Sequence, residues 1–258
     1  MSERAQYIPG TFSWVDLTTT DQEAAKRFYS ALFGWEATDL PIGNGAFYSM
    51  MKLGGKDVAA ISPQPQQQRE AGVSPTWNSY ITVRNADETL QCVSALGGSV
   101  HSPAFDVMDA GRMAVAQDPH GVFFLLWEPK EHIGAQLVNA PGAFSWNELA
   151  SPDFEASKHF YSELFGWTTE PFEGTGQPYF VIKNGETGNG GMRSPQPDEP
   201  PNWSVYFGVE ELDQGLEKVS ALGGKVLAGP IDIGVGKIGV VQDPQGAVFV
   251  LYAGVFGP

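Results

Sequence analysis

The chain has 258 residues, a hydrophobic fraction of 42% and a formal net charge of −15, with a sequence pI of about 4.5. This length and apolar content predict one large or two ordinary globular domains, and so acidic a chain repels phosphate backbones, which argues against a nucleic-acid partner. No apolar run of about 18 residues occurs and no basic start precedes an apolar stretch, so we expect neither a membrane span nor a secretory signal.

The single cysteine, Cys92, excludes an intramolecular disulfide framework and a cysteine-rich zinc site. It lies in the segment 87–98, "DETLQCVSALGG", which has helical spacing. We expect it to be a small buried hydrophobic residue. A reducing cytoplasm is the compartment that this cysteine usage favours.

The first predicted elements are a strand and a helix. Residues 11–18 ("TFSWVDLT") alternate and are rich in β-branched and aromatic side chains, which predicts a strand. Residues 21–34 carry apolar side chains at helical spacing. Asp21 is suited to accept from the free amides of the first turn, and Gly34 to end the helix in a left-handed conformation. Two short strands are predicted next, at 46–53 and 57–62.

The same order then returns. Residues 77–83 ("WNSYITV") predict a strand and residues 86–98 a helix. Strands at 112–117 and 122–128 follow, joined by the tight turn "DPHG" at 118–121. One half of the chain therefore consists of two strand-helix-strands modules.

The second half of the chain repeats the first. Residues 9–35 and 141–167 align without a gap and are identical at 17 of 27 positions, and "SALGG" and "QDPxG" also recur. The duplication predicts two domains, 9–131 and 141–258, with a linker at 132–140. We expect Trp35 and Trp167, which follow the helix-ending glycines, to fix each helix to its sheet.

Four such modules, with "FY…LFGW" after the first strand and "DPxG" before the last, resemble the vicinal-oxygen-chelate superfamily of glyoxalases, bleomycin-resistance proteins and extradiol dioxygenases. The resemblance is closest to two-domain glyoxalase-like proteins of actinobacteria, some of which are called hydroxylases. It implies an α+β fold of tandem domains, each made of two strand-helix-three-strand modules whose curled mixed sheets form a cup with the helices outside. The chemistry of the family takes place in that cup.

The family enzymes hold a divalent metal ion with His, Glu or Gln side chains on the cup strands. The resemblance places those ligand positions in this chain at residues without such side chains: Trp14, Asn78, Leu125 and Ala60 or Ile61, and in the second copy Trp146, Ser204, Val250 and Gly191 or Met192. The four histidines, at 101, 120, 132 and 159, are scattered, and we expect ordinary surface or turn residues there. The sequence therefore predicts no metal ion and no cofactor.

Strand alternation predicts which side chains share the concave face. In the first cup Phe12 is expected to join this face, and in the second Phe144. The candidate ligand-binding residues are Trp14, Tyr48, Asn78, Tyr80 and Trp127 in the first cup and Trp146, Tyr179, Ser204, Tyr206 and Tyr252 in the second. One carboxyl group accompanies each set. No catalytic residue is assigned, but Asp16 and Glu148 are candidates for an acid or base if burial raises their pKa.

Three functions remain open at this point. The aromatic cups favour metal-independent binding of a small aromatic or apolar molecule, as in resistance or sequestration proteins. The resemblance also allows a glyoxalase-type lyase or an oxygenase or hydroxylase that uses the same cup. The rings could instead fill the cups as a core, in a protein-interaction module. The internal duplication favours a monomer, with a homodimer as the alternative.

Overall fold

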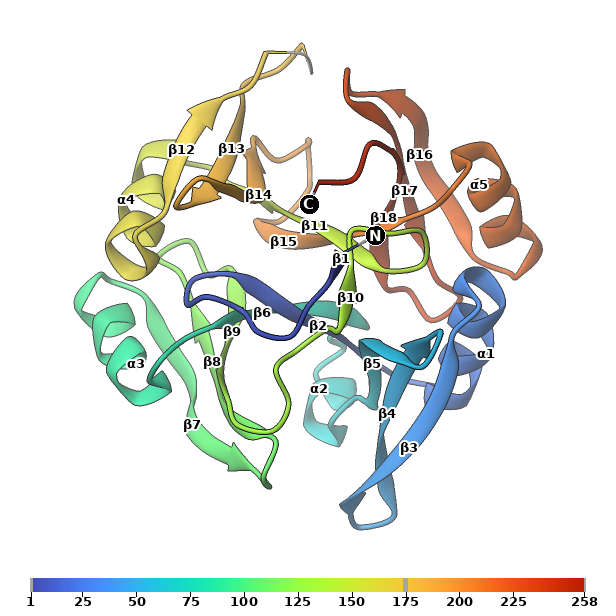
Figure 1. Cartoon of the computed structure of the whole chain (residues 1–258), viewed down its shortest axis with the longest axis horizontal. Helices are drawn as coiled ribbons and strands as arrows, with labels where there is room; N and C mark the ends of the chain where they lie inside the picture. The colour runs from blue at the N-terminus through green and yellow to red at the C-terminus, as the bar shows by residue number, and fades with distance from the viewer. Residues whose placement is uncertain (1, 174–175, 258) are drawn as a thin grey trace.

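The computed structural model describes residues 2–173 and 176–257, and it contains one eight-stranded sheet for each repeat. Figure 1 shows the first repeat and the second as two halves of the molecule, with both chain ends near its centre. The elements of the first repeat are β2 (Phe12–Thr19), α1 (Gln22–Phe33), β3 (Glu36–Gly43), β4 (Ala46–Leu53), β5 (Lys56–Pro63), α2 (Gln66–Glu70), β6 (Thr76–Thr82), α3 (Ala86–Ala95), β7 (Ser99–Val107), β8 (Gly111–Gln117) and β9 (Phe123–Pro129). Those of the second are β11 (Phe144–Ala150), α4 (Phe154–Phe165), β12 (Thr168–Pro171), β13 (Tyr179–Asn184), β14 (Thr187–Arg193), β15 (Asn202–Gly208), α5 (Leu212–Ala221), β16 (Lys225–Asp232), β17 (Gly236–Gln242) and β18 (Val248–Gly254). The predicted α+β fold with strand-helix-three-strand modules is confirmed.

The two modules of each repeat meet edge to edge along their first strands. The strand order is β3-β4-β5-β2-β6-β9-β8-β7 in the first sheet and β12-β13-β14-β11-β15-β18-β17-β16 in the second. At the centre of the first sheet β2 and β6 pair antiparallel, while β2 with β5 and β6 with β9 are parallel. The floor of each cup is thus built from the first strands of two modules.

Short β1 (Ser2–Glu3) and β10 (Leu137–Val138) pair with each other outside these sheets. Because β10 belongs to the segment between the repeats, the N-terminus is fixed to that segment. The exact limits 9–131 and 141–258 for two domains remain a prediction.

The repeated sequence at the start of each long helix forms the predicted caps. The Asp21 carboxylate accepts from the amide of Ala24, and Asp153 does the same for Ala156. Gly34 and Gly166 end these helices with φ of 77° and 73°, in the left-handed region that glycine favours.

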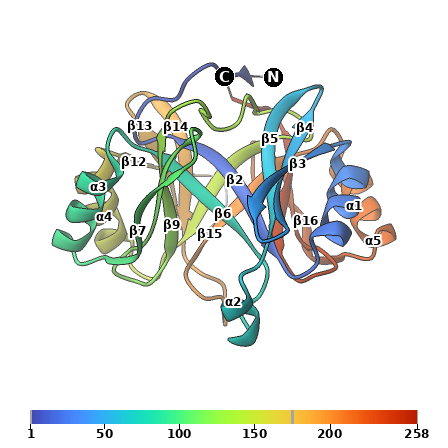
Figure 2. The ribbon, with the colours of Figure 1, turned by 90° about the horizontal axis from the view of Figure 1, so that it is seen from below.

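The helices lie outside the sheets, with α1 next to α5 at one side and α3 next to α4 at the other (Figure 2). Each neighbouring pair has one helix from each repeat. The helix layer is therefore also part of the interface between the two repeats.

Hydrogen bonds of the repeated motifs cross this interface in both directions. The Tyr29 hydroxyl donates to Asp243 of the second "DPxG" turn at 3.0 Å, and the Tyr161 hydroxyl donates to Asp118 of the first at 3.1 Å. Burial raises the pKa of both aspartates and of both tyrosines. The recurrence of "FY" and "DPxG" thus reflects reciprocal contacts between the repeats.

Each of the two "LFGW" tryptophans forms a hydrogen bond with the other repeat. Trp35 Nε1 donates to the Gly142 carbonyl at 2.6 Å, and Trp167 Nε1 donates to the Gly10 carbonyl at 2.7 Å. Gly142 has φ +79°, and an added Cβ would meet Leu53 at 2.9 Å. A side chain at this position would be strained by the positive φ and would press on Leu53 and on the Phe33 carbonyl oxygen, 3.1 Å away in the other repeat.

Cys92 is exposed, so the expectation of a buried thiol is wrong. The inner face of α3 carries Ala86, Leu90 and Val93, and Cys92 projects from the opposite side. The edge strand β3 lacks a clear alternation and was not predicted, because it has a neighbour on one side only and is exposed along its length. Among the described residues, no helix has the length and apolar character needed to cross a bilayer.

Candidate functional site

In the first cup the structure brings four predicted residues around Asp16. One oxygen of its carboxyl group accepts from the hydroxyls of Tyr80 at 2.7 Å and Tyr48 at 3.1 Å, and the other accepts from the Asn78 amide at 2.8 Å. Trp14 Nε1 donates to the Tyr48 hydroxyl at 2.9 Å. Both carboxyl oxygens of Asp16 are therefore already occupied by donors of the protein.

Most of this cluster is buried, while Tyr48 and Asn78 are half-buried. Asp16 is 4% exposed, and Trp14, Tyr80 and Trp127 are 4%, 5% and 6% exposed. Burial raises the pKa of Asp16, and the three hydrogen bonds to its carboxyl group lower it by less. Burial, followed by the charge of Asp16, also keeps the pKa of Tyr48 and Tyr80 well above the usual value. Both tyrosines consequently remain hydrogen-bond donors at neutral pH.

The second cup has a glutamate at the matching place, with a different partner. Glu148 is 5% exposed and accepts from Arg193 Nε at 2.6 Å. The other two guanidinium nitrogens of Arg193 donate to the two oxygens of Glu199, each at 2.7 Å. The result is a fixed carboxylate–guanidinium–carboxylate row that runs from Glu148 at the floor of the cup to Glu199 in the connection between β14 and β15.

The ion pairs dominate the electrostatics of the second cup. Burial disfavours the charged guanidinium of Arg193, but Glu199 and Glu148 outweigh it and raise its pKa. Burial and then the charge of Glu148 raise the pKa of Tyr179 and Tyr206. Arg193 therefore stays charged at any ordinary pH, and both tyrosines stay protonated.

Aromatic rings line the second cup, and several are half-buried. Trp146 Nε1 donates to the Tyr179 hydroxyl at 3.0 Å, which repeats the Trp14–Tyr48 pair. Trp146, Tyr179 and Ser204 each keep part of their surface accessible, whereas Tyr206 is buried. An added Cβ on Gly191 would lie 1.9 Å from the Tyr179 hydroxyl oxygen, so this glycine makes room for the ring.

One expected member of the first cup lies elsewhere. Phe12 packs on Trp203 and Trp167, with ring centroids 4.9 Å and 5.5 Å apart, in the interface between the repeats. The prediction that it shares the face of Trp14 is wrong, because the β2–β6 register shifts between these two residues and interrupts the alternation. In the second cup the Tyr252 hydroxyl donates to the carbonyls of Val235 and Val255.

The linker contributes a residue that the sequence did not indicate. The His132 ring lies edge-on to Trp14 with centroids 4.7 Å apart and 6.0 Å from Trp127, so this half-buried loop histidine also contacts the rings of the first cup. Trp127 Nε1 donates to the His132 carbonyl at 2.8 Å. Burial lowers the pKa of His132. His101 and His159 are exposed, and His120 is half-buried in its turn.

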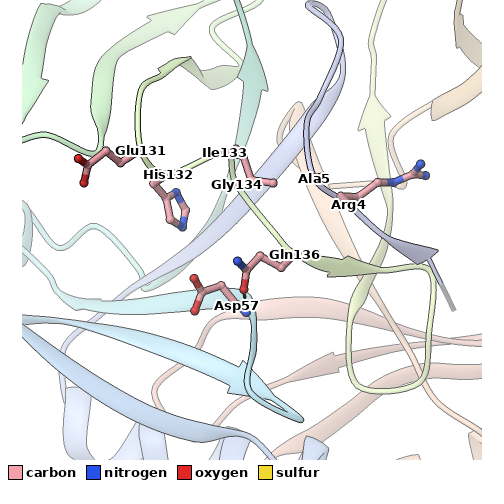
Figure 3. A pocket seen from close by; sticks show the side chains of 8 residues that line it. All are labelled: Arg4, Ala5, Asp57, Glu131, His132, Ile133, Gly134 and Gln136. Atoms are coloured by element: carbon pink, nitrogen blue, oxygen red, sulfur yellow. Dashed lines mark hydrogen bonds between the residues drawn. The ribbon is translucent and has the colours of Figure 1, made fainter.

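A cavity of about 330 Å³ adjoins His132 (Figure 3). Arg4 and Ala5 come from the N-terminal segment, Asp57 from β5 and Glu131 from the end of the first domain, and the linker contributes His132, Ile133, Gly134 and Gln136. His132 is the residue shared by the cavity and the aromatic first cup.

Arg193 and Glu199 were also not predicted. A possible signal was the repeat itself, since Arg193 stands before the second "SPxP" where the first copy has Ile61. The charged Arg193 replaces an apolar isoleucine at the same position of the repeat, which indicates that the two cups differ in charge at this point.

The residues present do not fit the metal ion that the enzymes of the resembling family use. Asp16 pairs in register with Asn78 and Ala60, and Glu148 with Ser204 and Gly191, so one carboxyl group stands alone on each floor. In the described part of the chain no three His, Cys, Asp or Glu side chains are grouped as metal ligands. We derive no step through a metal ion.

Comparison with known proteins agrees with this fold. The sequence pattern of the Glyoxalase/Bleomycin resistance protein/Dioxygenase superfamily matches residues 11–126 and again residues 143–251. The chain belongs to this superfamily. Membership fits small-molecule binding or an activity of the glyoxalase or dioxygenase type.

Relatives match over almost the whole chain. A Mycobacterium tuberculosis protein named "Putative glyoxylase CFP32" is 46% identical over 253 residues, covering 96% of this chain and 97% of the relative. The "Anthracycline biosynthesis protein DnrV" of Streptomyces peucetius is 30% identical over 258 residues, covering 95% and 93%.

Solved structures share the fold at low identity. The Mn(II)-bound glyoxalase from Novosphingobium aromaticivorans has a TM-score of 0.66 at 18% identity, covering 95% of this chain and 82% of that one. The 2,3-dioxygenase LapB from Pseudomonas sp. KL28 has a TM-score of 0.66 at 16% identity, covering 98% and 95%. These similarities support the architecture alone.

Proposed function

We propose that the protein binds a small aromatic or apolar molecule in one or both sheet cups without a metal ion. The observation that carries this proposal is the chemistry of the cup floors, where aromatic rings surround a single carboxyl group whose partners are protein donors. Concave sites of this composition suit flat apolar ligands with one or two polar groups.

The second cup is the better candidate. Trp146 keeps accessible surface there, whereas the matching Trp14 of the first cup is buried. The tyrosines do not differ in this respect, since Tyr48 and Tyr179 are both half-buried and Tyr80 and Tyr206 are both buried. The Glu148–Arg193–Glu199 row fixes the floor and offers charge next to the rings. A ligand could stack on the accessible rings and place a hydroxyl or amine near this row.

The relatives support a polycyclic aromatic ligand. Two Streptomyces proteins of 29% and 30% identity are named as anthracycline biosynthesis proteins, and anthracyclines contain fused planar rings. Fused rings of this kind match a site whose accessible surface comes from indole and phenol rings.

Ligand-observed NMR with 2-hydroxyanthraquinone tests the proposal in chelator-treated protein. Trp146→Ala should weaken binding by about tenfold or more, because a stacking surface is lost. Phe47→Ala, which removes an exposed ring on β4, is the matched control and should bind like the unaltered protein. Equal binding by both variants would remove the second cup from the proposal.

A glyoxalase-type lyase or an oxygenase is the second candidate. It is supported by the superfamily and by the burial that raises the pKa of Asp16 toward the range of a general base. Turnover of a methylglyoxal–thiol adduct that is lost in Asp16→Asn or Glu148→Gln would favour this candidate. Absence of turnover with and without added Mn²⁺ would leave binding as the better account.

A further inference from the structure

The His132 ring occupies an unusual place for an imidazole. It lies against Trp14 and Trp127, and its Nε2 atom is buried without a hydrogen-bond partner among the residues that the structure describes. A buried polar atom of this kind normally has a partner, so one without a partner calls for an explanation. The two tryptophans give this ring apolar contacts, and their Nε1 groups donate to Tyr48 and to the His132 carbonyl rather than to the imidazole.

The backbone of the linker holds this ring in place. The Ala135 amide donates to the Ser13 carbonyl and the Gln136 amide to the Asp57 carbonyl, each at 2.7 Å. Gly134 has φ +110°, and an added Cβ would lie 2.3 Å from the Ser13 carbonyl oxygen, so the linker runs directly on β2. The backbone hydrogen bonds of the linker therefore hold His132 over the first cup.

The cavity next to His132 provides room for the imidazole to leave the cup. Its volume of about 330 Å³ exceeds that of one side chain, and Asp57, Glu131 and Gln136 on its wall can accept from or donate to an imidazole. Inside the cup Nε2 has no partner, whereas in the cavity it would have several. Displacement would bring Nε2 next to polar groups, but it would give up the contacts of the imidazole with Trp14 and Trp127.

We propose that His132 fills a ring-sized subsite of the first cup that binds a small apolar aromatic ring when the imidazole turns into the cavity. This inference rests on the proposed use of the cups for binding, and it assigns the first cup to a single benzene-sized ring. The apparent affinity of the unaltered protein is lowered by the fraction of molecules in which the imidazole has left.

Toluene is the probe, and saturation-transfer NMR of the full chain gives its Kd. His132→Ala should bind toluene about tenfold or more tightly than the unaltered protein, because no ring has to be displaced. His101→Ala, which removes an exposed histidine that contacts Phe123, is the matched control and should leave the Kd unchanged. An unchanged Kd in folded His132→Ala would overturn the inference.

His132→Phe keeps the inference testable if the alanine variant does not fold. A phenyl ring satisfies the apolar surroundings and leaves no unpartnered nitrogen, so the Tm should rise and toluene binding should be lost. A lower Tm for His132→Phe contradicts the assignment of an apolar subsite.

Trp146→Ala separates this inference from the proposed function. It lies in the second cup and should leave the toluene gain of His132→Ala intact. If that gain disappears in the double variant, toluene binds in the second cup, and this inference fails while the proposed function stands.

Discussion

At the residue scale, the two cup carboxyl groups occupy matching positions but have different partners. Asp16 accepts from neutral hydroxyl and amide donors, whereas Glu148 pairs with the Arg193 guanidinium. A buried charge that loses its only cation costs several kcal/mol, while one surrounded by neutral donors depends on hydrogen bonds alone. Neutral hydrogen-bond donors therefore hold the carboxyl group of the first cup, and an ion pair holds that of the second.

Arg193→Gln should lower the free energy of unfolding by about 3 kcal/mol, because Glu148 and Glu199 lose their shared cation. Lys183→Gln, which removes the ion pair to the exposed Glu170, is the control and should cost less than about 1 kcal/mol. Urea denaturation at pH 7 measures both. A cost for Arg193→Gln no larger than the control would show that the row does not stabilise the second cup.

His132 should make stability depend on pH. Its pKa lies below 6.5 in the folded protein, so below pH 6.5 the unfolded chain binds a proton that the folded protein does not. Stability therefore falls as the pH drops from 6.5 toward the lowered pKa. The charge of Asp57 opposes this shift and that of Lys52 adds to it.

The difference between the unaltered protein and His132→Phe isolates this effect from that of Asp16 and other acids. Denaturation at pH 7.5 and pH 5.5 should show the unaltered protein losing more stability than the variant. Equal losses would mean that the imidazole is protonated as easily in the fold as in the unfolded chain.

At the element scale, the first long helix of each repeat, α1 and α4, and the central strands of each sheet could be predicted from the sequence. Caps, helical spacing and alternation act within a few residues, so the pattern is visible locally. The pairing partner of a strand and the position of a β-bulge are not local. For that reason Trp14, Asp16, Asn78 and Tyr80 were placed together correctly, while Phe12, Arg193 and His132 were not. Whether these side chains bind a ligand stays a prediction.

The N-caps of α1 and α4 give a test at this scale. Asp21→Ala and Asp153→Ala should each lower the free energy of unfolding by about 1 kcal/mol, since a first-turn amide loses its acceptor. Asp21→Asn keeps an acceptor oxygen and should stay close to the unaltered protein. Thermal denaturation followed by circular dichroism distinguishes the two outcomes, and an equal loss in the asparagine variant would point to charge rather than capping.

At the scale of the whole molecule, the two repeats form one structure. Reciprocal bonds from Tyr29 and Tyr161 and a shared set of rings, such as Trp77 against Phe207 at 4.8 Å, span the interface. Separating the repeats would expose these rings and leave two buried aspartates short of a donor. We therefore expect a single cooperative unfolding transition.

Tyr29→Phe and Tyr161→Phe should each lower the free energy of unfolding by about 1–3 kcal/mol, because Asp243 or Asp118 loses a buried donor. Tyr252→Phe, whose hydroxyl bonds only within its own repeat and is part-exposed, should cost less than about 1 kcal/mol. Denaturation followed by tryptophan fluorescence and far-UV circular dichroism should give coincident curves. Two separate transitions in the unaltered protein would contradict the joint structure.

Calorimetric titration of chelator-treated protein with 2-hydroxyanthraquinone, repeated after addition of Mn²⁺, tests metal-free binding most directly. We predict saturable binding whose Kd is the same in both titrations and is weakened by Trp146→Ala. Heat of binding that appears only after Mn²⁺ is added, or no binding up to about 1 mM ligand, would contradict the proposed function.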